Sequence, residues 1–182
     1  MLKAVLPLAL LASPAVAAGL DIEVAGQANG TIHVNLFEDV APQHVEQITA
    51  LASEGAYDGV VFHRVIDGFM AQTGDVEYGK QGGDMSRVGT GGSDRPDIPA
   101  EFSDSLSFDR GVVGMARSQN PNSANSQFFI MFEPGPFLDG QYTIVGEVTD
   151  GMDVVDQIKR GDGPNGSVTS EPDVMTSVTV TE

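Results

Sequence analysis

Hydrophobic and polar residues alternate with a period of two along most of the chain. Ile32, Val34 and Leu36 alternate with polar neighbours, which is typical of a strand that buries one face, and Asn29-Gly30 before them is a tight-turn pair. This pattern predicts an opening β-hairpin. Similar short runs, separated by Gly, Asn, Asp or Pro, occupy residues 60–66, 69–73, 111–116, 127–132, 142–148 and 173–181. The sequence therefore predicts an all-β domain.

Two segments have the helical period instead. Residues 42–55 place an apolar stripe on one face and begin with Pro42, which suits the first turn of a helix. Residues 150–161 also place an apolar stripe on one face, and Asp150 is their expected N-terminal cap. A large antiparallel sheet has vulnerable edges unless it closes on itself. We therefore expect a closed β-barrel of about eight antiparallel strands, capped at its open ends by two α-helices.

The first residues follow a different pattern. Lys3 supplies a positive charge, residues 4–12 are almost wholly apolar, and residues 15–17 have the small-x-small form of a cleavage signal. The apolar run is shorter than the roughly 20 residues of a membrane-spanning helix, and prolines interrupt it. We therefore expect residues 1–17 to be a signal peptide and residues 18–182 to form the domain. The mature protein would be periplasmic, without stable membrane association after the leader is removed.

Charge narrows the choice of partners. The chain has 26 Asp and Glu against 9 Lys and Arg, a formal net charge of −17, and no cysteine. Phosphate backbones and anionic lipids would repel such a surface, so we expect no nucleic-acid partner. The lack of cysteine excludes disulfides, thiolate-bound zinc and a cysteine nucleophile. A monomer is the default for a small closed barrel.

The sequence lacks the motifs of most catalytic chemistries. There is no Gly-x-Ser-x-Gly elbow, and His33, His44 and His63 fall on separate elements without the spacing of a zinc motif. The glycine-rich run at 89–92 has neither the flanking strand and helix nor the Lys-Ser/Thr pair of a phosphate-binding loop. The twelve-residue calcium loop is also missing. We therefore expect no metal and no cofactor.

A candidate groove remains. The strand predicted at 60–66 places Arg64 on one face with Phe62 and Ile66, which is a costly location for a guanidinium unless it lines a groove. Composition alone leaves a binding groove and a polar-rimmed barrel surface equally open. Two further strands place a glutamine on one face with large apolar residues: Gln72 with Met70, and Gln127 with Phe129 and Met131.

The order of the residues resembles a known family. Residues 62–75, FHRVIDGFMAQTGD, closely resemble the signature of the cyclophilin family of peptidyl-prolyl cis-trans isomerases. Later segments resemble further cyclophilin blocks in the family's order, at residues 89–92, 101–102, 114–117, 121–130 and 137–140. The resemblance covers nearly all of the expected mature chain. It implies an exported cyclophilin of bacterial type, with the family's eight-stranded barrel and two helices.

The resemblance also implies a role for each site residue. Arg64 would be the catalytic arginine. The walls of the proline pocket would be Phe69, Met70, Phe129 and Leu138, and the substrate backbone would bond to Gln72 and Gln127. The edge that takes the residues before proline would be formed by Ala116, Arg117 and Ser118. Better-known eukaryotic members have Trp and His at the positions of Phe137 and Tyr142. Because that Trp is a drug contact, Phe137 implies weaker binding of cyclosporin.

The implied activity explains the missing catalytic motifs. Rotation about an Xaa-Pro bond breaks no covalent bond, and its barrier of about 20 kcal/mol comes from amide resonance. The expected substrates are extended Xaa-Pro segments of unfolded or flexible proteins, so the enzyme would assist the folding of exported proteins. One alternative is a non-catalytic proline-segment binder or chaperone with the same groove. Another is a barrel that stores a small ligand, but inward-facing Phe128, Ile130 and Phe132 predict a filled lumen.

Overall fold

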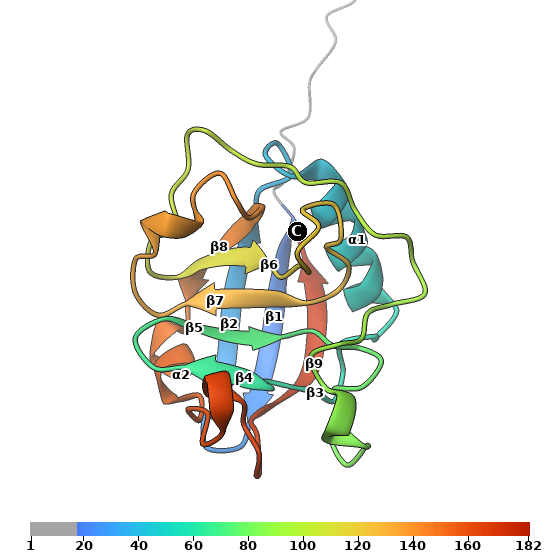
Figure 1. The fold of residues 1–182 in the computed structure, drawn as a ribbon, viewed down its shortest axis with the longest axis vertical. Helices are drawn as coiled ribbons and strands as arrows, with labels where there is room; N and C mark the ends of the chain where they lie inside the picture. The colour runs from blue at the N-terminus through green and yellow to red at the C-terminus, as the bar shows by residue number, and fades with distance from the viewer. Residues whose placement is uncertain (1–17) are drawn as a thin grey trace, which may run out of the picture.

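The computed structural model describes residues 18–182 (Figure 1). The expected signal peptide at residues 1–17 lies outside the described residues. Among residues 18–182, no helix combines the length and the hydrophobicity that crossing a membrane requires.

A single antiparallel sheet forms the body of the protein. Its strands are β1 (Gly19–Ala25), β2 (Gly30–Leu36), β3 (Val60–Val61), β4 (Arg64–Ile66), β5 (Met70–Thr73), β6 (Val112–Met115), β7 (Phe128–Met131), β8 (Ile144–Asp150) and β9 (Val174–Thr181). They lie side by side in the order β3-β9-β1-β2-β8-β6-β7-β5-β4. The sheet curls, so that β6, β7, β5 and β4 lie in front of β2, β1 and β9 in Figure 1. The all-β prediction is confirmed, and the expected hairpin is β1 paired with β2.

The two end strands of the sheet are neighbours in the chain. The strand predicted at 60–66 is divided into β3 and β4, so the sheet has nine strands rather than eight. Phe62 and His63 join them: Phe62 N donates to Asp173 O at 2.9 Å, and His63 O accepts from Val168 N at 2.9 Å. The chain bends here because β3 pairs with β9 while β4 pairs with β5 at the other end of the sheet. The covalent chain, rather than a ladder between β3 and β4, therefore connects the two ends.

Two α-helices flank the curled sheet, as predicted. Helix α1 (Pro42–Ser53) packs against β9, and α2 (Met152–Gln157) packs against β2. Short 3₁₀ helices η1 (Met85–Arg87), η2 (Pro136–Leu138) and η3 (Pro164–Gly166) lie in the loops. Asp150 as the cap of the second helix was wrong, because Asp150 ends β8 and Gly151 is the N-cap. A Cβ on Gly151 would lie 2.3 Å from Thr31 O, so this close approach to β2 requires glycine.

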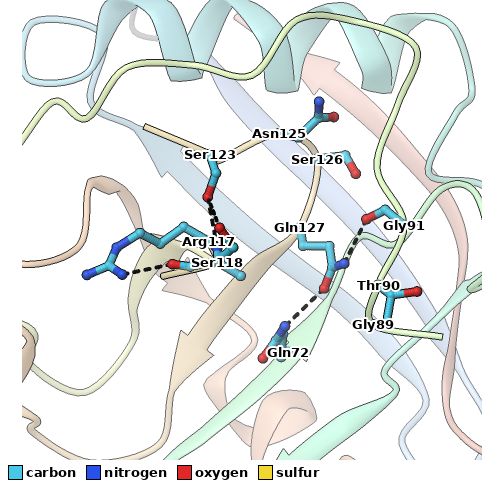
Figure 2. Close-up of a pocket in the computed structure, with 11 residues that line it drawn as sticks. Gln72, Gly89, Thr90, Gly91, Arg117, Ser118, Ser123, Asn125, Ser126 and Gln127 are labelled. Carbon is cyan, nitrogen blue, oxygen red and sulfur yellow. Dashed lines mark hydrogen bonds between the residues drawn. The ribbon is translucent and has the colours of Figure 1, made fainter. Parts of the chain in front are cut away.

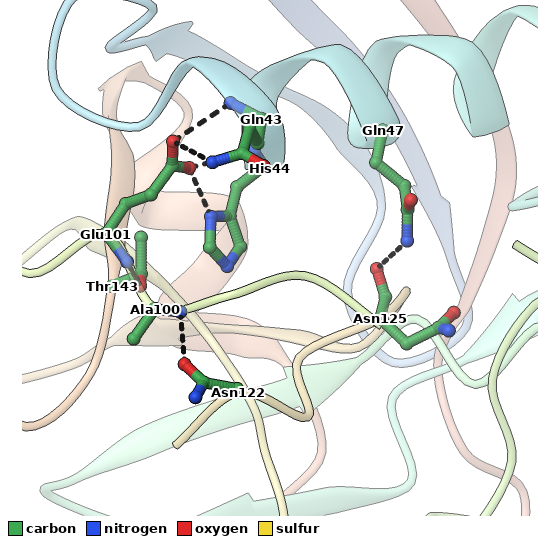
Figure 3. A network of polar contacts seen from close by, with 8 residues as sticks. All are labelled: Gln43, His44, Gln47, Ala100, Glu101, Asn122, Asn125 and Thr143. Carbon is green, nitrogen blue, oxygen red and sulfur yellow. Dashed lines mark hydrogen bonds and ion pairs between the residues drawn. The ribbon is translucent and has the colours of Figure 1, made fainter. Parts of the chain in front are cut away.

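Helix α1 receives its N-terminal cap from a distant loop. Ala41 at the N-cap has no side-chain acceptor to offer. Glu101 instead accepts from Gln43 N at 3.2 Å and from His44 N at 3.1 Å, and its carboxylate lies 2.5 Å from His44 Nδ1 (Figure 3). These contacts satisfy backbone donors that a helix start leaves free. They also fix the long loop between β5 and β6 against the helix.

The interior of the curled sheet is filled by side chains. Phe128 and Ile130 of β7, with Phe132 beyond it, are buried in the main core, and Tyr57 meets Phe128 edge-on with ring centroids 5.6 Å apart. One interior hollow measures about 10 Å³, which is the scale of a single water molecule. This packing confirms the predicted filled lumen and leaves no room for a stored ligand there. The opposite face of β7 supports the site described next.

Candidate functional site

Two adjoining hollows form a groove on the outer face of β4, β5 and β7. The first hollow, of about 430 Å³, has polar as well as apolar groups in its lining, and we call it the apolar hollow after its aromatic and aliphatic walls. It is lined by the predicted residues Arg64, Phe69, Met70, Gln72, Ala116, Arg117, Phe129, Phe137, Leu138 and Tyr142, with Gln141 in addition. The polar hollow, of about 360 Å³, contains the predicted Ser118 and Gln127 and shares Gln72, Ala116 and Arg117 with the first (Figure 2). The structure therefore brings every predicted site residue together in one groove.

Strand register places the central residues. Arg64 of β4 lies opposite Gln72 of β5, and Gln72 in turn lies opposite Phe129 of β7. Residues directly opposite each other in an antiparallel pair project to the same face, so the three side chains share one face of the sheet. Met70 lies two residues before Gln72 and opposite Met131, on the same face. Residues far apart in sequence therefore meet because three neighbouring strands share one register.

Two acceptors hold the guanidinium of Arg64. Nε donates to the backbone carbonyl of Asn165 at 3.0 Å, and Nη1 donates to Gln72 Oε1 at 3.2 Å. Nη1 also lies 3.9 Å from the Met70 sulfur. In the described part of the chain Nη2 has no protein acceptor, so its two N–H groups are free to donate to a ligand.

Arg64 is half-buried against apolar side chains. Burial lowers the pKa of Arg64 from its ordinary value, and the charge interaction with Tyr142 opposes that shift. A guanidinium stays protonated throughout the physiological range, so the group remains a cation. Its hydrogen bonds are stronger here than in water, because the surroundings are less polar.

Aromatic and aliphatic side chains form the walls of the apolar hollow. Phe129, Met70 and Leu138 are buried, and together with Phe108 they belong to a second hydrophobic cluster below the groove. Phe108 stacks on Phe129 with centroids 5.7 Å apart, and Tyr142 meets Phe129 edge-on at 5.9 Å. This support fixes the floor of the hollow before any ligand enters.

The rim of the apolar hollow is more exposed. Phe137 is 63% exposed and lies against Phe69, with ring centroids 5.5 Å apart. The Arg117 guanidinium lies over the Tyr142 ring, with Cζ 4.3 Å from its centroid, and donates to Gln141 O. The rim therefore differs from the buried floor in its exposure to solvent.

A chain of amide hydrogen bonds connects the two hollows. Arg64 donates to Gln72, Gln72 Nε2 donates to Gln127 Oε1 at 3.0 Å, and Gln127 Nε2 donates to Gly91 O at 2.8 Å. Figure 2 shows Gln127 between Gln72 and Gly91, pointing into the polar hollow. Because each amide both donates and accepts, the chain fixes the orientation of both glutamines. The groove thus has a cation at one end and ordered amides along its length.

Sequence reasoning missed several residues that support the groove. Asn165 was not singled out because its role depends on the backbone carbonyl, which every residue has. Asp75 was quoted only as part of the family signature, although its buried carboxylate holds the loop at Gly89 and Gly91. Gln141 was missed because it contributes its carbonyl to Arg117. An aspartate at the end of a predicted strand, ahead of a glycine-rich run, is the one sequence signal that could have been used.

The histidines have structural roles in the described protein. His44 contacts Glu101, and His33 on the surface contacts Asp21. His63 is buried next to Arg64, and neither ring nitrogen has a hydrogen-bond partner in the described residues. No group of three or more His, Asp or Glu residues within 18–182 is arranged to hold a metal ion.

Burial of His63 predicts a pH-dependent stability. Desolvation lowers its pKa from 6.5 to about 4, against the opposing effect of Asp75. The unfolded chain therefore binds the proton more readily than the folded protein. We expect the free energy of unfolding to be highest above pH ~6.5 and to fall by roughly 3 kcal/mol as the pH drops to ~4. Denaturant unfolding across this range measures the slope. His63→Gln should reduce the slope, and burial of His44, which also lowers its pKa, should account for part of the slope that remains. An unchanged slope in His63→Gln would contradict the assignment.

Comparison with known proteins gives a consistent result. Residues 20–180 match the family described as cyclophilin type peptidyl-prolyl cis-trans isomerase/CLD. A protein of Brucella suis named a probable peptidyl-prolyl cis-trans isomerase is 60% identical over 154 residues, which cover 84% of this chain and 78% of the relative. Peptidyl-prolyl cis-trans isomerase B of Escherichia coli is 38% identical over 166 residues, covering 85% of this chain and 96% of the relative.

A solved structure shares the fold. It is the crystal structure of a cyclophilin-type peptidyl-prolyl cis-trans isomerase of Cryptosporidium parvum in the presence of the dipeptide Ala-Pro. It superposes with a TM-score of 0.76 at 26% sequence identity, covering 90% of this chain and 99% of the other.

Proposed function

Because the chain belongs to the cyclophilin family of peptidyl-prolyl cis-trans isomerases, we propose that Arg64 accelerates rotation about Xaa-Pro bonds by stabilising the twisted amide in the apolar hollow. The observation that supports this most directly is the position of the guanidinium. It is half-buried at the wall of a hollow with aromatic and aliphatic side chains, is held through Nε and Nη1, and has no protein acceptor on Nη2 among the described residues. A cation fixed in this way needs little rearrangement during the reaction.

The chemistry requires stabilisation of one geometry only. As the amide twists it loses resonance, and the prolyl nitrogen becomes pyramidal and gains a lone pair that can accept a hydrogen bond. A charge-assisted bond from Arg64 worth about 2–3 kcal/mol would supply roughly a hundredfold in rate. Positioning of the ring and exclusion of water would provide the remainder. No acid, base, metal or cofactor takes part.

The shape of the groove supports extended substrates. The proline ring would occupy the apolar hollow against Phe129 and Met70, and the preceding residues would pass Ala116 and Arg117 toward the polar hollow. Gln72 and Gln127 would bond to the substrate backbone there. Such a groove admits Xaa-Pro segments of unfolded or flexible proteins, because a folded segment could not lie along both hollows. We therefore propose a role in protein folding.

We further propose that this role concerns exported proteins and is performed in the periplasm. The support is the sequence of residues 1–17, with its charged start, apolar run and small-residue cleavage signal. N-terminal sequencing of the mature protein would locate the cleavage site.

An exchange measurement on a proline peptide tests the proposed activity. The wild-type protein should accelerate cis-trans interconversion of an Ala-Pro peptide in magnetisation-exchange NMR. Phe129→Ala should lower kcat/KM by about tenfold or more, because the ring loses the main wall of its hollow. Phe102→Ala removes an exposed ring outside the groove and serves as the matched control. Binding of the peptide without faster interconversion would instead favour the non-catalytic binder.

A further inference from the structure

The segment 161–168 lies along β4 and contacts its backbone at Arg64 and at the residues on either side of it. Gly161 N donates to Val65 O at 2.8 Å, and Val168 N donates to His63 O at 2.9 Å. Ser167 forms an isolated antiparallel bridge with Arg64. These contacts tie the turn that contains η3 to the strand from both sides. The turn therefore moves only if β4 moves with it or the contacts break.

Within this turn, Asn165 has an unusual backbone conformation. Its φ of 56° and ψ of 25° lie in the left-handed region, which is sterically unfavourable for most residues other than glycine. Its side chain is exposed and makes no hydrogen bond among the described residues. What Asn165 contributes is its carbonyl, which accepts from Arg64 Nε. Asparagine suits the position because it tolerates this conformation better than most residues.

Packing keeps the turn from relaxing. Gly166 also has positive φ, at 78°, and a Cβ there would lie 2.4 Å from Ile66 Cγ1. The backbone thus sits as close to β4 as a glycine allows. The strained conformation of Asn165 is held in place by its neighbours, which is the usual condition for such a residue to persist.

We propose that Asn165 is a positioning residue for Arg64, and that its left-handed backbone aims the carbonyl at Nε. With Gln72 Oε1 on Nη1, this second acceptor fixes the plane of the guanidinium at the wall of the apolar hollow and leaves Nη2 without a protein acceptor among the described residues. A long arginine side chain held by one acceptor alone could rotate about it. The proposal rests on the proposed role of Arg64 and adds the element that orients it.

Three variants test this arrangement. Asn165→Val places a β-branched residue where the left-handed conformation is most strained, while Asn165→Gly retains the conformation and the carbonyl. The matched control is Glu171→Val, because Glu171 is the other non-glycine residue with positive φ in the described chain, at 45°, and it is exposed. Strain of the same kind is then introduced away from Arg64.

We expect Asn165→Val to lower kcat about tenfold with little change in KM, the scale of one hydrogen bond to a charged group. Asn165→Gly should restore kcat to near the wild-type value, and Glu171→Val should leave it unchanged. The ¹H–¹⁵Nε resonance of Arg64 should shift toward that of a solvent-exposed arginine in Asn165→Val only.

The outcomes separate the two proposals. Wild-type kcat in Asn165→Val, or equal losses in Asn165→Val and Glu171→Val, would overturn the positioning role. An Arg64 Nε resonance that does not respond to Asn165→Val would also overturn it, independently of activity. A wild-type protein without isomerase activity, in contrast, would overturn the proposed function while the resonance could still respond.

Discussion

Replacing Arg64 by lysine should reduce turnover about a hundredfold while the protein folds normally. Lysine keeps the positive charge, so the expected loss comes from geometry and hydration. An ammonium group has no planar fork, and it cannot accept the fixed orientation that Asn165 O and Gln72 Oε1 impose on a guanidinium. It is also more strongly hydrated and would draw water into the apolar hollow.

The fold should tolerate this change. Arg64 is only half-buried, and the ladder from β4 to β5 depends on backbone groups that lysine also provides. The free energy of unfolding, from denaturant titration, should therefore change little. Arg64→Ala, measured alongside, should lose at least as much turnover.

Peptide exchange at saturating substrate measures the effect on kcat directly. A rise in KM with unchanged kcat would mean that Arg64 binds the ground state and the twisted amide equally. Near-full activity of Arg64→Lys would refute the assignment of Arg64 as the catalytic group.

Local sequence patterns were sufficient for most elements of the fold. Alternation predicted the strands because each buries one face, and the apolar stripe with Pro42 predicted α1 from Pro42 to Ser53. The cap of α2 could not be found locally, because Gly151 is required by the close approach of Thr31, more than a hundred residues away. The division of the strand at 60–66 likewise follows from pairing with β9 on one side and β5 on the other.

The arrangement of the site also depends on contacts between segments that are distant in the sequence. Periodicity placed Gln72 and Phe129 on faces of their own strands, but only the register of β5 with β7 brings those faces together. The resemblance to a family supplied that step for side chains. It supplied nothing for Asn165, whose contribution is a backbone carbonyl in a particular conformation. Residues that act through the backbone have no signature in a single sequence.

Asp75 is the residue whose loss should most affect both stability and the polar hollow. Its carboxylate is fully buried, and each oxygen accepts two backbone hydrogen bonds. Oδ1 accepts from Glu77 N at 3.2 Å and Tyr78 N at 2.8 Å, and Oδ2 accepts from Gly89 N at 2.7 Å and Gly91 N at 3.0 Å. A Cβ on Gly91 would lie 2.4 Å from Oδ1, so the loop approaches as closely as glycine permits.

Asp75→Ala should lower the free energy of unfolding by about 3–5 kcal/mol, because it removes a buried charged acceptor that serves four backbone donors. Asp75→Asn should cost about half as much, since the amide oxygen can still serve one pair of donors while the NH₂ group cannot serve the other. Denaturant unfolding at neutral pH gives both values. Equal stability of Asp75→Ala and the wild type would show that the loop does not depend on the carboxylate.

Asp75→Asn should weaken the recognition of long peptides more than that of short ones. Gly91 O accepts from Gln127, so a loop released from Asp75 also releases the amide that orders the polar hollow. Arg64 keeps its bond to Asn165, which does not involve this loop, and its other partner, Gln72, is separated from Gly91 by Gln127. We therefore expect Asp75→Asn, at temperatures where it is folded, to raise KM several-fold for peptides with two or more residues before proline, with little change for an Ala-Pro dipeptide. Equal increases for long and short peptides would mean instead that the two hollows act as one site.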